Sequence, residues 1–228
     1  MIDEMNGYRS ILWAVATSLV ACQGFSAAKP SRGTGLGNSL TAVDLENPRT
    51  RTKVLVEAIK WSDLVIGGDG LHYHRRSKTL YTGWVKYTWG FREDGRGLMR
   101  FEKGKKNGLL VSWYDNGRKA LEDHYVNGRL RSSASWKPNG VKCPLTKVVN
   151  GDGIRIVYEM NGRKQCQGAY VGGLAHGLWT MWPDDGTTRQ VGHYKQGKED
   201  GVWHYYDRFG KITHSETWTN GELIEGSP

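Results

Sequence analysis

The chain has 228 residues and a net charge of +9, and it contains 31 Gly, 10 Trp and 11 Tyr but only four Phe. Such a chain cannot fill a large aliphatic core, yet it is too aromatic to be disordered, so many short strands joined by glycine turns suit it best. Apart from short basic runs at 75–78 and 103–106 the positive charges are spread along the chain, so we expect a solvated basic surface and no nucleic-acid partner.

The first 28 residues are predicted to be a signal peptide. Residues 11–21 carry no charge and follow Arg9, and this apolar stretch is too short to span a bilayer of about 30 Å. Translation from Met5 instead of Met1 would remove the acidic residues that are unusual in such a segment. We therefore expect an exported protein.

Two cleavage sites compete in this segment. Residues 19–22 resemble a bacterial lipobox, in which Cys22 would be lipidated and would anchor the protein to the cell envelope. Residues 26–28 fit ordinary signal peptidase, which would yield a secreted or periplasmic protein. Both remain open.

Between the signal peptide and the repeats we expect a linker and a cap. Residues 29–52 are rich in Gly, Ser and Pro, which predicts a flexible linker. Residues 53–79 are predicted to form the N-terminal cap and first strand, with a short amphipathic helix over 53–65 that covers the first edge of the sheet. Residues 71–74 and 80–89 then predict an introductory hairpin.

His72 and His74 would share one face of a strand, as the first ligands of a metal site would. The sequence suggests no third ligand nearby, so we expect surface or hydrogen-bonded histidines, no metal and no cofactor.

The strongest signal is a repeat, because residues 177–223 contain nearly the same 24 residues twice and the pattern continues upstream in weaker form to about Gly83. The residue pattern of each unit predicts a first strand, an Asx-Gly turn, a second strand and a second glycine turn. We expect type I′ two-residue turns, which suit Asn-Gly and Asp-Gly, at the first turns 116–117, 139–140, 161–162 and 185–186. The first turn at 209–210 departs from that chemistry, and a longer loop is the alternative there.

This turn assignment predicts the strand register. In four units an aromatic residue falls opposite the opening glycine, and we expect its ring to cover that glycine: Gly108 with Tyr125, Gly153 with Tyr170, Gly177 with Tyr194, and Gly201 with Trp218. In the unit from Arg131 to Gly151 the register places Arg131 opposite Val148, and Pro144 predicts an irregular strand.

The predicted fold is therefore all-β: an elongated single-layer antiparallel sheet of successive β-hairpin repeats over residues 80–224, with a short N-terminal capping helix. Alternation along the strands places Trp113 and its counterparts on one face. The opposite face carries Trp179, Met181, Trp203 and Tyr205, which are the candidate binding residues because binding energy concentrates on aromatic surfaces. Stacking within the sheet is the alternative role for these four residues.

The same register predicts free thiols at Cys143 and Cys166. Cys143 would pair with Trp136 and Cys166 with Val157, and these pairs point to opposite faces of the sheet.

The pattern Gly-x-Trp-x-x-Tyr/Trp, an Asx-Gly turn, then Tyr-x-x-Gly-x-x-x-Gly resembles the MORN repeat, and more narrowly the bacterial variant that often carries an antitoxin label. The resemblance covers about residues 80–224. It implies an elongated, twisted antiparallel sheet that serves as a protein-binding scaffold and sometimes lies at membranes.

No catalytic motif is present in the sequence, so we expect no enzyme. The leading hypothesis is a non-catalytic exported scaffold for protein–protein interaction, whose partner the sequence does not name. The alternatives are association with an anionic membrane surface and an antitoxin or immunity role.

Overall fold

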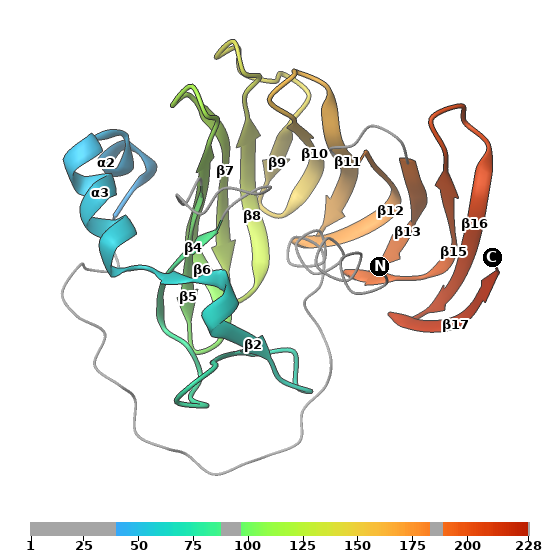
Figure 1. Cartoon of the computed structure of the whole chain (residues 1–228), viewed down its shortest axis with the longest axis horizontal. Coiled ribbons are helices and arrows are strands. Elements are labelled where there is room, and N and C mark those ends of the chain that lie inside the picture. The colour runs from blue at the N-terminus through green and yellow to red at the C-terminus, as the bar shows by residue number, and fades with distance from the viewer. Residues whose placement is uncertain (1–39, 88–96, 183–188, 228) are drawn as a thin grey trace.

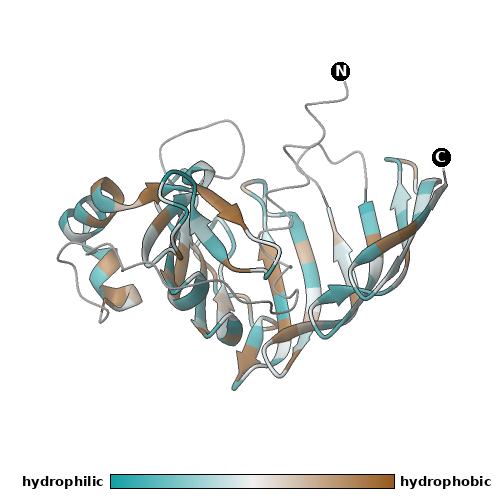
Figure 2. Ribbon diagram, turned by 90° about the horizontal axis from the view of Figure 1, so that it is seen from below, coloured by the Kyte–Doolittle hydropathy of each residue, from teal (hydrophilic) through white to brown (hydrophobic). Residues whose placement is uncertain are grey.

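A computed structural model describes residues 40–87, 97–182 and 189–227 (Figure 1). It confirms an all-β fold, built as one long open antiparallel sheet of successive hairpin strands, with two short α-helices near the N-terminus. The sheet curves along its length (Figure 2). The predicted signal peptide and Cys22 lie outside the described residues.

The strands of the long sheet follow one another almost in sequence order, from β1 to β17. In chain order they are β1 (Ile59–Lys60), β4 (Gly83–Tyr87), β5 (Gly97–Glu102), β6 (Lys105–Trp113), β7 (Lys119–Val126), β8 (Arg129–Ser135), β9 (Lys147–Val149), β10 (Asp152–Tyr158), β11 (Lys164–Val171), β12 (Leu174–Met181), β13 (Arg189–Lys195), β14 (Lys198–Glu199), β15 (Gly201–Tyr206), β16 (Ile212–Thr219) and β17 (Glu222–Ser227).

The N-terminal cap begins earlier than predicted. Two helices, α2 (Ala42–Glu46) and α3 (Pro48–Glu57), occupy part of the segment predicted to be a flexible linker. Thr41 and Asn47 explain the early start, because their side chains accept hydrogen bonds from the first backbone N–H groups of α2 and α3. The helix predicted over 53–65 therefore ends at Glu57.

The edge of the sheet is covered by a strand instead of that helix. β1 pairs in parallel with β4, and a 3₁₀ turn, η1 (Trp61–Asp63), follows it. The introductory hairpin is confirmed only in part, because Tyr73 forms an antiparallel bridge with Leu80 but the longer strand pairings differ. β3 (His72–His74) pairs with β2 (Leu64–Ile66), while β4 pairs with β5.

The turn chemistry is the reverse of the prediction. At the first turns that the structure describes, only the glycine has positive φ, as in Gly117, and Tyr114 N–H donates to the Arg118 carbonyl across a three-residue loop. The turn predicted at 185–186 lies outside the described residues. The loops at Gly140, Gly162 and Gly210 have the same hydrogen bonds. Two-residue turns with positive φ at both positions, typical of type I′, occur at the second turns: 103–104, 127–128, 150–151, 172–173, 196–197 and 220–221.

The predicted register is nevertheless confirmed in all four regular units. A three-residue loop shifts the pairing by one residue, and a β-bulge on the second strand shifts it back. In the β6–β7 hairpin the extra residue is Ala120, because Trp113 pairs with Lys119 and Ser112 with Leu121. The same bulge follows the loops of the β10–β11 and β15–β16 hairpins.

The unit from 131 to 151 is irregular, as predicted, but its register differs. Val148 pairs with Ser133 rather than Arg131, and β9 has only three residues. The Cys143 N–H donates to the Ser135 carbonyl, so Cys143 lies one residue from its predicted partner. Cys143 and Cys166 are nevertheless free thiols in different core clusters, which confirms the prediction.

Two faces of the sheet carry separate cores. The aromatic face, as we call the side that carries Tyr125, Tyr170, Tyr194 and Trp218, holds the largest cluster of buried residues. The helix face is the opposite side, on which α2 and α3 pack against Leu109, Val111 and Trp113. Figure 1 shows these helices at one end of the sheet and β15–β17 at the other.

Candidate interaction surface

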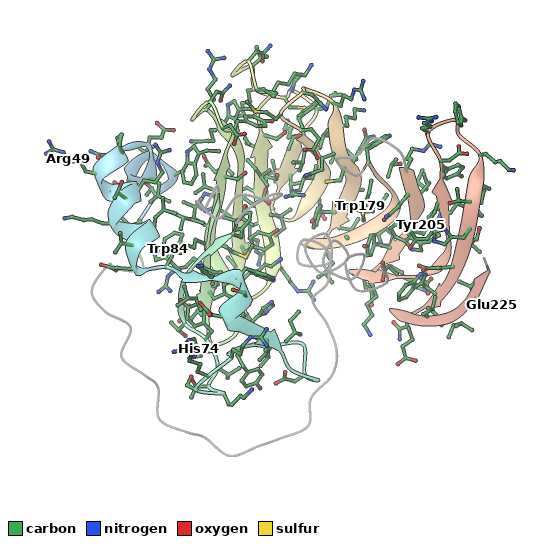
Figure 3. All side chains as sticks on the ribbon, in the orientation of Figure 1. Arg49, His74, Trp84, Trp179, Tyr205 and Glu225 are labelled. Carbon is green, nitrogen blue, oxygen red and sulfur yellow. The ribbon has the colours of Figure 1, made fainter. Side chains whose placement is uncertain are left out.

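The four candidate binding residues lie on the aromatic face, in the C-terminal half of the sheet. Trp179 and Trp203 are each 1% exposed, Met181 is buried, and Tyr205 packs partly buried against the same cluster. Figure 3 marks Trp179 and Tyr205 on these strands. The structure brings the four residues together, but it leaves little of the first three for a partner to contact.

The burial of the two tryptophans comes from a ladder of aromatic rings. The ring centroids of Tyr170 and Trp179 are 5.5 Å apart, those of Trp179 and Tyr194 are 5.6 Å apart, and those of Tyr194 and Trp203 are 5.2 Å apart. All three pairs are edge-to-face, which the ring quadrupoles favour. These residues therefore stabilise the sheet.

The rings cover different glycines from those predicted. A Cβ atom added to Gly177 would meet nothing within 4 Å, so the ring of its partner Tyr194 does not lie over it. The Trp203 ring instead lies on Gly192, where an added Cβ would be 2.1 Å from a ring atom, and Trp179 lies in the same way on Gly168. The tyrosines turn toward these tryptophans, and each tryptophan covers a glycine on the preceding strand.

An ion pair occupies the corresponding position nearer the N-terminus. Asp123 takes the place of Gly168 and Gly192 in the repeat, and it is fully buried. Arg155 Nε and Nη2 donate to Asp123 Oδ2 at 3.1 and 3.0 Å, and Arg155 is buried as well. The side chains of Asp123 and Arg155 therefore occupy a part of the core that an aromatic ring occupies in the later units.

Lys106 lies close to this pair. Its Nζ is 5.4 Å from the centroid of the Tyr125 ring, and the side chain is buried, although the basic run to which it belongs was predicted to be solvated. Burial, together with the positive charge of Arg155, lowers the pKa of Lys106 to about 8.

At the C-terminal end Glu216 takes the position of Gly192, and it is buried. Its Oε2 accepts hydrogen bonds from Tyr205 Oη at 2.5 Å and from Trp218 Nε1 at 3.2 Å. The Tyr205 ring is also stacked on His214 with their centroids 4.0 Å apart. These contacts hold Tyr205 in place.

The helix face of β4–β6 is closed by α2 and α3. Ala42, Leu45, Val54 and Ala58 form one buried cluster with Trp84 and the residues of β5 and β6 behind it. Trp84 lies beside α3 (Figure 3). The helices thus bury the apolar residues that this face presents.

The helix face of β12–β16 carries the same repeat positions, and no helix of the described residues packs on it. The residue that follows the opening glycine is Leu109 under the helices and is 3% exposed, whereas Ile154, Leu178 and Val202 at the same position are 41%, 56% and 44% exposed. Between these regions Ile156 and Tyr158 are buried with Cys143 from the irregular unit. The open surface therefore begins beyond the irregular unit.

Charged residues of both signs border this open surface. Lys195 and Arg189 are exposed there, and the Arg189 guanidinium lies 4.8 Å from the centroid of the Tyr206 ring. His193 faces Leu178 across the strand pair. On β17, Glu225 pairs with Thr217 and Glu222 pairs with Thr219 on the same face. We call this surface, centred on Leu178 and Val202, the open helix face.

Sequence reasoning placed Leu178 on the face of Trp113 but did not select it as a site residue. The available signal was the apolar residue after each opening glycine, which recurs as Leu109, Ile154, Leu178 and Val202. Periodicity alone could not show which of these four positions the helices cover.

The remaining candidates have structural roles. His72 is buried and its Nδ1 lies 3.1 Å from the Gly104 carbonyl oxygen, while His74 Nδ1 lies 3.3 Å from Ser77 Oγ, so both are hydrogen-bonded as expected. Within the described part of the chain, no group of three or more His, Cys, Asp or Glu residues could hold a metal ion. None of the described helices is long and apolar enough to cross a membrane.

No family model matches the sequence, and no curated protein is similar to it.

Proposed function

We propose that the chain is an exported, non-catalytic repeat scaffold that holds a protein partner on the open helix face. One observation supports this most directly: Leu178 and Val202 are about half exposed at a repeat position whose counterpart, Leu109, is buried by helices. Exposed apolar residues that recur on one face of a sheet mark a surface for contact with another molecule. The resemblance of the repeats to MORN scaffolds agrees with this role.

This proposal moves the binding residues from one face to the other. Trp179, Met181 and Trp203 remain necessary because they stabilise the sheet that presents the surface, but their burial makes them poor contact residues. Contact residues are instead Leu178 and Val202, with Lys195 at the rim.

Site-specific photocrosslinking tests the function. A benzoylphenylalanine placed at residue 178 of the full chain, in the cells that naturally make it, should yield a discrete protein adduct on irradiation. The matched control is residue 145, because Leu145 is also a highly exposed leucine but lies outside the open helix face. An adduct from 178 and none from 145 is expected; no adduct from 178, or equal adducts from both, would overturn the proposal.

A further inference from the structure

We infer that the outer edge of β17 takes up an extended β-strand of a partner protein, and that this strand carries an aromatic residue followed by Lys or Arg. This contact is separate from the one on the open helix face, and so it goes beyond the proposed function. The two ends of the sheet differ in the way that such a contact requires (Figure 1).

The N-terminal end of the sheet is closed by the chain itself. β1 pairs in parallel with β4, and α3 ends just before β1. Ile59 of β1 packs against the buried cluster of the aromatic face. The outer side of β4 therefore has a strand beside it, whereas an uncovered edge presents unpaired N–H and C=O groups to other chains.

The C-terminal end is open. Among the described residues β17 has a neighbour on one side only, which is β16. Leu223 and Ile224 are 51% and 63% exposed, and the side chains of Glu222 and Glu225 are exposed as well. β17 follows a second turn, as β6, β10 and β12 do, but each of those three strands also pairs with a following strand. The edge of β17 is therefore the place where one more strand fits the repeat.

The aromatic face of β17 has room for a ring. Trp179 and Trp203 each cover a glycine on the strand before them. Gly226 lies on the same face because it pairs with Glu216, and a Cβ atom added to it would meet nothing within 4 Å. An aromatic residue opposite Gly226 on an added strand would cover this glycine in the same way.

Glu222 and Glu225 determine the charge of the added strand. They pair with Thr219 and Thr217, so both project from the helix face of β17. On an antiparallel strand, the residue after the one opposite Gly226 lies opposite Glu225. Opposite charges that face each other across two strands stabilise the pairing, and like charges destabilise it. A Lys or Arg therefore suits this position.

A second copy of the chain is a poorer occupant of this edge. Pairing of two β17 strands would gather Glu222 and Glu225 of both copies on one face of the junction. It would also leave Gly226 without a ring, because β17 contains no aromatic residue. Self-association through β17 therefore contradicts the inference.

β13 of the same chain supplies a defined probe, because Tyr194 is followed there by Lys195. A labelled and capped peptide of residues 189–195 is titrated with the full chain and followed by fluorescence anisotropy. Two control peptides carry Lys195→Glu or Tyr194→Ala. The unaltered peptide should bind about fivefold more tightly than either control. Equal binding of all three peptides would overturn the inference.

Hydrogen exchange locates the bound peptide. The backbone amides of residues 222–227 should exchange more slowly in its presence, because an added strand pairs with the groups at the outer edge of β17. The amides of β12 and β15, which are the neighbours of β13 within the chain, should be unaffected. Binding that leaves the exchange of residues 222–227 unchanged would contradict the inference.

A charge reversal in the full chain tests the role of the carboxylate. Glu225→Lys should weaken binding of the unaltered peptide about fivefold and should make the Lys195→Glu peptide the better ligand. Glu57→Lys is the matched control, because it makes the same change of net charge on α3, and it should leave the binding unchanged. Both side chains are exposed, so circular dichroism of the variants should match the wild type.

Sedimentation velocity of the wild type tests the second copy. A concentration-dependent dimer whose formation protects the amides of residues 222–227 would show that another copy takes this edge, and the inference would be wrong. Crosslinking at residue 178 reports on the open helix face, so the proposed function can stand when this inference fails.

Discussion

At the β6–β7 hairpin Leu109 and Val111 are buried under α2 and α3, whereas at the β12–β13 hairpin Leu178 occupies the position of Leu109 and is 56% exposed. The aromatic faces of the two hairpins differ as well. Near the N-terminus Asp123 and Arg155 fill the core with an ion pair, while further along Trp179 and Trp203 lie over glycines. The backbone register is the same in both regions.

This difference shows that the repeat determines the strand pairing, while a few positions on each face determine how that face is filled. Replacing a glycine with Asp123 removes the space for a tryptophan and requires a cation, because a buried carboxylate is stable only when it is paired. At one end of the sheet α2 and α3 bury the helix face, whereas at the other end the apolar residues of the same face are exposed. Hairpins with the same register can thus bury this face in one region and expose it in another.

The largest effect should come from breaking the ion pair. Arg155→Ala leaves the Asp123 carboxylate buried without its cation, and we expect the free energy of unfolding to fall by about 3–5 kcal/mol in urea denaturation. Adding Asp123→Asn to that variant should restore part of the loss. A loss below about 1 kcal/mol would show that the pair does not hold this region.

A matched leucine pair compares the two regions on the helix face. Leu109→Ala should destabilise the protein by about 2–5 kcal/mol because it leaves a cavity under α2 and α3. Leu178→Ala should change the free energy of unfolding by less than about 0.5 kcal/mol, since its side chain is half exposed. Equal losses of stability from the two variants would mean that Leu109 and Leu178 are equally buried.

Acid should act on the N-terminal end through His72. Burial, with the nearby charge of Lys106, lowers the pKa of His72 to about 4 from its ordinary 6.5. The unfolded chain therefore binds a proton below pH 6.5 that the folded chain takes up only near pH 4. Stability is fully present above pH 6.5 and falls between these two values, by up to about 3 kcal/mol.

Urea denaturation of the wild type and of His72→Gln at several pH values measures this dependence. The variant lacks the titrating imidazole, so its stability should change less between pH 6.5 and pH 4 than that of the wild type. Parallel curves for the two proteins would show that His72 is not the titrating group.

The smallest expected difference is between alanine variants of two glycines in the same hairpin. Gly192→Ala should cost about 2–3 kcal/mol because the new methyl group collides with the Trp203 ring. Gly177→Ala should cost about 1 kcal/mol, since its added methyl group meets nothing and only its positive φ is unfavourable. Thermal unfolding of both variants checks the order, and a larger loss at Gly177 would contradict the ring positions.

Much of the fold was predictable because the repeat is local. The spacing of glycines and aromatic residues predicted the strands, the alternation of faces and the pairing of Gly177 with Tyr194. The turn types were wrong, since an Asn-Gly pair fits both a two-residue loop and a three-residue loop. The compensating bulge left the register intact and so hid this error.

The candidate surface could not be predicted in the same way. Leu109 and Leu178 follow the same opening glycine in the repeat, so local sequence does not distinguish them. Their exposure differs because α2 and α3, about 50 or more residues away in sequence from β6, fold back over one of them. Burial is a property of long-range packing and is therefore visible only in three dimensions.

The sequence by itself determined that this protein is a row of hairpins with aromatic residues on one face, because turn chemistry and two-residue periodicity act over a few neighbouring positions. The tertiary structure decided which residues are available to a partner. It made Trp179 and Trp203 core residues by packing them edge-to-face against Tyr170 and Tyr194. It left Leu178 and Val202 exposed because the helices that bury Leu109 pack at the other end of the sheet.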